Sequence, residues 1–209
     1  MKTKFMEAMN FRHACKVFDE TKTISDEDIN FIMEVARKSP SSFGMEGWKF
    51  LVVTNEELKK KLRPYCWDQV QITSCSHLIV VLSAIESVKI DSGIPRKRFE
   101  RRELGKEKTD IYMGVYANHL KDVLPSDTNI YSWTVRQTYI AVGNMMTAAA
   151  CIGIDSCPIE GLEKENVEKV LGLDTSKYQL SMLLPLGYRI NPQSKQLREP
   201  FEDIVEFIK

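Results

Sequence analysis

The cysteines and histidines are the first side chains in this sequence that could carry chemistry, because a thiol beside an imidazole can act as a nucleophile pair. Cys15 stands two positions after His13, although neighbours in sequence need not face each other in a fold. The five cysteines and three histidines are otherwise scattered, with no C-x-x-C spacing. An odd number of cysteines without paired spacing argues against a disulfide framework and a zinc site, so we expect no bound metal.

Several common catalytic motifs are missing. The sequence contains no GxGxxG, no GxxxxGK[ST], no HExxH and no GxSxG. Classical dinucleotide-binding, phosphoryl-transfer, metalloprotease and hydrolase functions therefore lack support.

Four other segments stand out together. They are 12–16 (RHACK, with Phe18-Asp19 behind it), 39–42 (SPSS, followed by WKF at 48–50), 153–161 (GIDSCPIEG) and 186–189 (LGYR, with REP at 198–200 beyond it). Taken singly, each has an ordinary explanation. Arg12 would be a surface arginine, Lys16 a solvated lysine, and residues 158–161 a turn before a helix.

In this order the four segments resemble the FMN-dependent nitroreductase family, and the resemblance extends from Arg12 to Pro200. The Pro-Ile-Glu-Gly and Arg-His-x-x-Lys segments are its most specific parts. The resemblance implies an α+β fold with a central, mostly antiparallel sheet flanked by helices. It also implies an intertwined homodimer that holds two FMN molecules in the subunit interface, with each C-terminal arm wrapped around the partner.

The resemblance assigns one group of residues to the phosphate end of FMN. Arg12 and Arg198 match the family's phosphate ligands, and guanidinium groups suit a phosphate dianion through paired, charge-assisted hydrogen bonds. Lys195 lies one position from the family's basic residue before that arginine. His13 and Ala14 would contribute mainly backbone groups near the phosphate and ribityl chain, since Ala14 lacks the hydroxyl that the family often has there.

A second group is assigned to the flavin ring. Lys16 matches the lysine beside the N1 and O2 edge, where a cation tunes the flavin. Asp68 and Gln71 match polar residues at the pyrimidine edge, and a carboxylate at position 68, where the family more often has Asn, could accept from N3–H. The segment that would lie along the flavin face consists of Pro158, Ile159, Glu160 and Gly161. In this segment the backbone N–H of Glu160 would point at N5.

The third group would come from the other subunit and consists of Pro40, Ser41 and Ser42. Gly44 and Gly47 follow in the same loop, where the family often has Asn and Pro, so the contacts of this loop with substrate depart from the family pattern. No side chain needs to act as a general acid, because water or the flavin could supply protons.

The function that the resemblance implies is an NAD(P)H-dependent oxidoreductase. NAD(P)H would give hydride to flavin N5 and leave, and an acceptor would then take its place in a ping-pong mechanism. Nitroaromatics, quinones or free flavins are the acceptor classes implied. Two alternatives remain open: reduction of an activated alkene or a halogenated ring on the same scaffold, and a non-enzymatic flavin-binding redox sensor.

The elements that must position these residues follow from hydrophobic periodicity. It predicts strands at Trp48–Thr54, His77–Ser83 and Gln179–Tyr188, and an extended segment over 12–18. Ser25 is the predicted N-cap of a helix, with Asp28 at N3 and Ile24 and Ile29 as a hydrophobic staple. The other predicted helices are 5–11, 55–63, 131–151 and 163–171. Because these elements do not alternate regularly as βαβ, the order favours α+β over a doubly wound sheet.

Two stretches have a distinctive charge pattern. Residues 96–108 carry seven positive and three negative charges, which is typical of a solvated helix face or of a basic rim that attracts phosphorylated ligands. The tail from Asn191 to Lys209 is polar first and then turns apolar, so its end needs a surface to pack on.

Length and composition set the remaining limits. The 209 residues, of which 43% are hydrophobic, fit one globular domain spanning 1–209. Lys plus Arg and Asp plus Glu are both 29, and this balance argues against nucleic-acid binding. Without a signal peptide or a membrane-length apolar run, we expect a cytoplasmic protein that makes no membrane contact.

Overall fold

The computed structural model describes residues 1–209 and contains one four-stranded sheet. Its strands are β1 (Trp48–Val53), β2 (His77–Ala84), β3 (Asp155–Ser156) and β4 (Tyr178–Gly187), in the order β1-β2-β4-β3. Every neighbouring pair is antiparallel. The α+β prediction is confirmed, and the three predicted strands are each within one residue of the observed limits.

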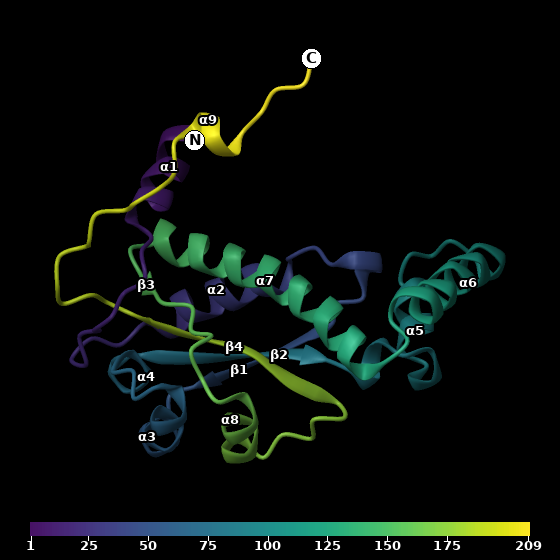
Figure 1. Ribbon diagram of the computed structural model, residues 1–209, viewed down its shortest axis with the longest axis horizontal. Helices are drawn as coiled ribbons and strands as arrows, with labels where there is room; N and C mark the ends of the chain where they lie inside the picture. The colour runs from purple at the N-terminus through teal and green to yellow at the C-terminus, as the bar shows by residue number, and fades with distance from the viewer.

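Helices cover both faces of this sheet (Figure 1). One face carries α2 (Asp26–Arg37) and α7 (Asp127–Cys151), and the other carries α3 (Glu56–Leu62), α4 (Gln71–Ser74) and α8 (Lys164–Leu171). Every residue of β2 is buried. Side chains alternate across a strand, so Leu78 and Val80 enter one apolar cluster while Ile79 and Val81 enter the other.

Helix α7 is the longest element and begins four residues before the predicted Tyr131. Ser126 caps it by accepting the Asn129 N–H at 3.2 Å, a signal that the apolar periodicity did not include. Thr138 faces the sheet, where its hydroxyl lies 2.7 Å from that of Ser181 on β4. Gly153, with φ of 77°, ends the helix in the left-handed conformation expected of a C′ residue.

The capping prediction for α2 is also confirmed. The Asp28 N–H donates to the Ser25 hydroxyl oxygen at 3.1 Å, and that hydroxyl donates to the Asp28 carboxylate at 2.8 Å. Ile24 and Ile29, the predicted staple, are both buried in the cluster beneath α7. Local sequence signals therefore fix the start of this helix.

The basic stretch 96–108 does not form one helical face. Helix α5 (Ile94–Glu100) ends within it, and α6 (Lys106–Val123), which the sequence did not predict, starts near its end. Arg96 and Arg101 form ion pairs with Asp110 and Glu46. Arg102 lies over the Phe99 ring and donates to the Phe43 carbonyl at 2.8 Å. Much of this charge is therefore used in holding α5 and α6 to the neighbouring loop.

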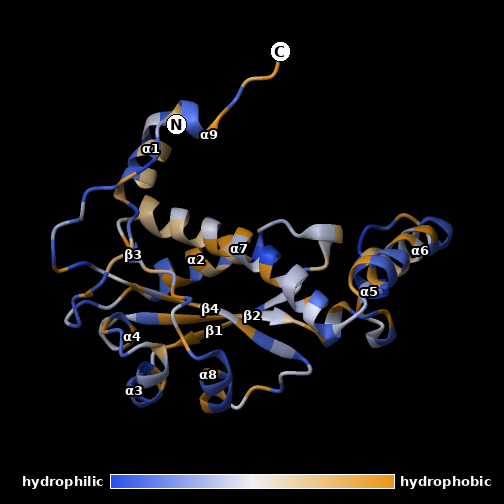
Figure 2. Cartoon of the chain, in the orientation of Figure 1, coloured by the Kyte–Doolittle hydropathy of each residue, from blue (hydrophilic) through white to orange (hydrophobic).

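The C-terminal tail passes the end of α1, beyond the end of α7 (Figure 1). Helix α1 (Lys2–Phe11) begins three residues before the predicted helix, and the tail contains a short α9 (Phe201–Ile204). Figure 2 shows the hydrophobic end of the tail projecting from the rest of the chain. No helix is both long and apolar enough to cross a bilayer.

Candidate active site

The predicted extended segment 12–18 joins the sheet edge beside β3. Ala14 forms an isolated bridge with Ser156, and Phe18 forms another with Arg189. The Cys15 N–H donates to the Ser156 carbonyl at 3.1 Å. Three of the four segments singled out in the sequence therefore meet at one edge of the sheet.

A buried ion pair locks this edge. The Asp155 side chain is 3% exposed and accepts from the Arg189 backbone N–H at 2.9 Å and from its Nε at 3.0 Å. The Arg189 Nη2 lies 2.7 Å from the other carboxylate oxygen, and His13 Nδ1 lies 3.6 Å from it. The Arg189 guanidinium also stacks 4.0 Å from the centre of the Phe11 ring, so the pair ties α1 to the sheet.

The first half of the tail caps the C-terminal end of α1. Gln193 donates to the Asn10 carbonyl at 2.6 Å, and the Gln196 amide donates to the carbonyls of Met9 and Asn10 at 3.1 Å. The same amide donates to the Arg12 carbonyl. These bonds satisfy helix-end carbonyls that would otherwise lack partners. They also place the tail positions on either side of Gln196 beside Arg12.

Three cations that follow α1 or belong to the tail have no anionic partner. Arg12 is half-buried, and neither it nor the exposed Lys195 and Arg198 forms an ion pair with a carboxylate. The Arg198 guanidinium donates only to the neighbouring Leu197 carbonyl, at 2.6 Å. Unpaired cations of this kind can bind an anion such as a phosphate dianion.

Lys16 lies close to Gln71 around a buried thiol. The Lys16 Nζ is 4.0 Å from the Cys157 Sγ, and the Gln71 Nε2 is 3.9 Å from the same sulfur. Burial raises the pKa of the Cys157 thiol, although the Lys16 ammonium acts in the opposite direction. The ammonium keeps its hydrogen-bonding capacity for a further ligand, since its only polar neighbour is this weak one.

The segment 158–161 is held by its backbone. Ile159 exchanges two backbone hydrogen bonds with Leu183, at 2.8 and 3.1 Å, and Gln69 donates to the Gly161 carbonyl at 2.9 Å. A Cβ on Gly161 would lie 2.6 Å from the Trp67 ring, so a larger residue there would require the exposed Trp67 side chain to move. The backbone N–H of Glu160 makes no hydrogen bond within the chain and remains available to an acceptor.

This arrangement matches a known family over most of the chain. The family model described as "Nitroreductase family" matches residues 9–188. The chain belongs to the nitroreductase family. The Bacillus subtilis protein named "Putative NAD(P)H nitroreductase YfkO" is 38% identical over 100% of this chain and 99% of its own length. The predictions of this family and of an oxidoreductase are confirmed.

Solved nitroreductase structures share the fold. A Bacillus subtilis nitroreductase-like structure, that of ydfN, superposes with a TM-score of 0.88 at 21% identity over 100% of both chains. A structure from Exiguobacterium sibiricum, described as a complex with FMN, has a TM-score of 0.82 at 25% identity. It covers 97% of this chain and 96% of its own.

Two parts of the predicted site, Asp68 and segment 40–42, lie apart from the other candidate residues. Asp68 is on the surface, where Arg63 Nε lies 2.8 Å from its carboxylate. Segment 40–42 lies beside Gln137 of α7, where the Ser42 N–H donates to the Gln137 side chain at 2.9 Å. It is not brought together with residues 158–161 of the same chain.

Four residues that contact the candidate segments were given no role from the sequence: Gln69, Tyr139, Arg189 and Gln196. Tyr139 on α7 donates a hydrogen bond to the Glu160 carboxylate. Arg189 and Gln196 hold the sheet edge and the tail through contacts with α1 and β3. Hydrogen bonds between polar residues far apart in the sequence leave no local sequence pattern from which these roles could be predicted. Arg189 does belong to the segment 186–189 that the sequence analysis singled out.

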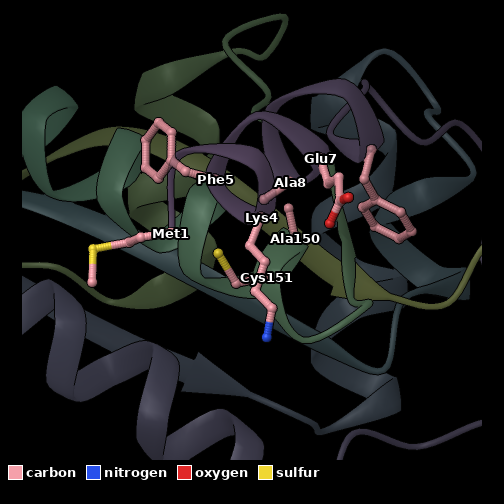
Figure 3. A pocket seen from close by; sticks show the side chains of 8 residues that line it. Met1, Lys4, Phe5, Glu7, Ala8, Ala150 and Cys151 are labelled. Atoms are coloured by element: carbon pink, nitrogen blue, oxygen red, sulfur yellow. The ribbon is translucent and has the colours of Figure 1, made fainter.

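A separate groove of about 630 Å³ lies between α1 and the end of α7 (Figure 3). Phe5 and Ala8 of α1 line it together with Ala150 and Cys151 of α7, and most of its lining is hydrophobic. It contains none of the predicted cofactor residues. Its apolar character suits a protein surface better than a phosphorylated cofactor.

Proposed function

We propose that this chain is an FMN-dependent oxidoreductase that passes hydride from NAD(P)H to nitroaromatics, quinones or related acceptors by a ping-pong mechanism. The observation that supports the proposal is the meeting of segments 12–18, 153–161 and 186–189 at one edge of the sheet, where Lys16 and Gln71 both lie near Cys157 and the N–H of Glu160 is free. FMN, when bound, supplies the redox chemistry at N5. The protein supplies binding, orientation and electrostatics.

The donor set fits FMN along its whole length. Arg12, Lys195 and Arg198 offer positive charge to the phosphate end. Lys16 and Gln71 offer donors to the N1–O2 and pyrimidine edge, and the Glu160 N–H is free for N5. The Asp68 carboxylate forms an ion pair with the Arg63 guanidinium. It still has free lone pairs that could accept a hydrogen bond from the flavin N3–H. His13 and Ala14 supply backbone groups between the two ends.

Arg198→Ala should weaken FMN binding by about tenfold or more, because one charge-assisted hydrogen bond contributes roughly 1.5–3 kcal/mol. Fluorescence titration of the apoprotein with FMN measures the change. Lys209→Ala removes a charge from the same tail and should leave the affinity unchanged. An unchanged affinity in Arg198→Ala would remove this residue from the site.

Lys16→Met should lower the midpoint potential of bound FMN by roughly 20–65 mV. Reduction adds negative charge at the N1–O2 edge, and a cation there stabilises the reduced state by roughly 1–3 kcal/mol in a partly wet site. Dye equilibration on fully loaded protein measures the potential, and Arg198→Ala serves as the control that should move affinity more than potential. A shift below ~10 mV would place Lys16 away from this edge.

The proposal includes a homodimer with a shared site. Gln137 and Tyr139 lie on opposite flanks of α7, because residues two apart on a helix do not face each other. Ser42 bonds to Gln137 on one flank, and Glu160 bonds to Tyr139 on the other. One subunit therefore cannot present both Pro40–Ser42 and Pro158–Gly161 to the same flavin, and a second subunit would supply the missing segment.

Exposed apolar residues support the same assembly. Phe5 and Met6 on α1 are 54% and 55% exposed, and the tail residues Phe201, Phe207 and Ile208 are at least 62% exposed. The groove in Figure 3 lies on this surface. A second copy of the chain would cover the groove and receive the apolar arm.

The visible spectrum of the purified protein, followed by FMN reconstitution, tests the cofactor. Turnover of NADH and NADPH with a nitroaromatic, a quinone and an activated alkene then compares the acceptor classes. Reduction of the alkene alone would favour the alternative reductase. Bound FMN without turnover of any acceptor would favour the redox sensor, and failure to take up FMN would overturn the proposal.

A further inference from the structure

A phenol and a carboxylate meet where α7 passes the segment 158–161. The Tyr139 hydroxyl donates to the Glu160 Oε1. Tyr139 is 41% exposed, so its hydroxyl could have been solvated instead. Partial burial raises the pKa of the Tyr139 phenol, and the hydrogen bond to the Glu160 carboxylate raises it further. The phenol therefore keeps its proton and acts as a donor.

Both partners of this bond are held by rigid surroundings. Thr138 anchors α7 to β4 through Ser181, which fixes the backbone next to Tyr139. On the other side, the backbone bonds of Ile159 with Leu183 and the contact of Gly161 with Gln69 fix the chain before and after Glu160. These backbone bonds do not fix the Glu160 side chain, and its hydrogen bond with Tyr139 restrains it.

We propose that Tyr139 is a positioning residue that holds the Glu160 carboxylate on the α7 side, away from the flavin face. The assignment rests on the proposed function, since it needs FMN beside residues 158–161. With its side chain held, Glu160 can direct its backbone N–H at N5 without placing a negative charge over the ring. Tyr139 itself does not touch the reacting atoms.

The sign of the effect follows from electrostatics. A carboxylate near a flavin that gains negative charge on reduction opposes that reduction, whereas Lys16 favours it. A hydrogen-bond donor on the carboxylate disperses its charge and limits the approach of its oxygens to the ring. Removal of the Tyr139 hydroxyl should therefore make the flavin harder to reduce.

The test compares Tyr139→Phe with Tyr131→Phe in the full-length protein. Tyr131 lies on the same helix but donates its hydroxyl to the Leu180 carbonyl at 2.7 Å rather than to Glu160. Tyr139→Phe should slow reduction of bound FMN by NADPH about tenfold and lower its midpoint potential, while the FMN Kd stays within about threefold. Tyr131→Phe should change neither the rate nor the potential.

Glu160→Gln provides the rescue, because it removes the charge that Tyr139 restrains. In the Glu160→Gln background, Tyr139→Phe should lose most of its effect on rate and potential, as expected for coupled neighbours. The apoprotein gives an independent readout. Burial raises the pKa values of the Tyr116 and Tyr131 phenols as well, so the titration is followed as a difference between variants. Phenolate absorbance should lose one high-pKa transition in Tyr139→Phe, and that transition should move to lower pH in Glu160→Gln.

The outcomes separate the two proposals. A wild-type protein that takes up no FMN would overturn the proposed function and this assignment together. If the wild type binds FMN and turns over, an unchanged potential in Tyr139→Phe would overturn the assignment alone. A full effect of Tyr139→Phe in the Glu160→Gln background would also overturn it, since the hydroxyl would then act without the carboxylate.

Discussion

Deletion of residues 191–209 should leave a monomer that binds FMN more than about a hundredfold more weakly than the full chain. The deletion removes Lys195 and Arg198, whose charge-assisted bonds are expected to contribute roughly 1.5–3 kcal/mol each. It also removes the exposed apolar arm that includes Phe201 and Ile208. Without the arm, the partner's Pro40–Ser42 segment would no longer be held at the site.

Sedimentation and FMN titration measure the two losses separately. A full-length variant with Phe201, Ile204, Phe207 and Ile208 changed to Ser keeps both cations and should lose the dimer, with a smaller loss of FMN affinity. Arg198→Ala should show the reverse, a dimer with weakened FMN binding. A truncated protein that sediments as an FMN-loaded dimer would contradict the role of the arm.

Asp155→Asn should destabilise the protein by about 3 kcal/mol, because removing one member of a buried ion pair leaves the other charge without compensation. The Asp155 side chain is 3% exposed, and Arg189 approaches it through its backbone N–H, Nε and Nη2. Since the guanidinium also stacks on Phe11 and donates to its carbonyl at 3.3 Å, the end of α1 should loosen as well.

Urea unfolding of the apoprotein measures this loss of stability. Asp110→Asn is the matched control, because Asp110 forms an equally short ion pair with Arg96, 2.7 Å long, between two side chains that are more than 40% exposed. Exposed pairs contribute little, so the control should unfold near the wild-type midpoint. Equal midpoints for the two variants would mean that the Asp155–Arg189 pair does not lock the sheet edge.

The sequence was sufficient for features that depend on near neighbours. Apolar runs placed each of the three predicted strands within one residue, because a strand buried on both faces has few positions for polar side chains. The Ser25 cap and Gly153 set helix limits through bonds to residues at most four positions away. The order of the four segments also indicated the family.

The sequence was less informative for elements that are mostly exposed and for elements held by ion pairs rather than by apolar packing. Helix α6 was missed because its residues are mostly exposed and only Thr109 and Tyr116 are buried. The charges of the basic stretch 96–108 are evident from the sequence, but the carboxylates that pair with them are not. Arg101, for example, pairs with Glu46, which lies 55 positions earlier. Charge alone does not indicate which carboxylate a folded chain brings into reach.

The composition of the site was determined by the sequence, whereas its assembly was decided by tertiary structure. Lys16 and Cys157 are 141 positions apart and come within 4.0 Å only because segment 12–18 joins the sheet beside β3. Likewise, Tyr139 reaches Glu160 because Thr138 faces the sheet at Ser181, which leaves Tyr139 on one flank of α7 and Gln137, bonded to Ser42, on the other. Such contacts depend on how helices pack on the sheet, and packing is a property of the whole folded chain rather than of any local segment.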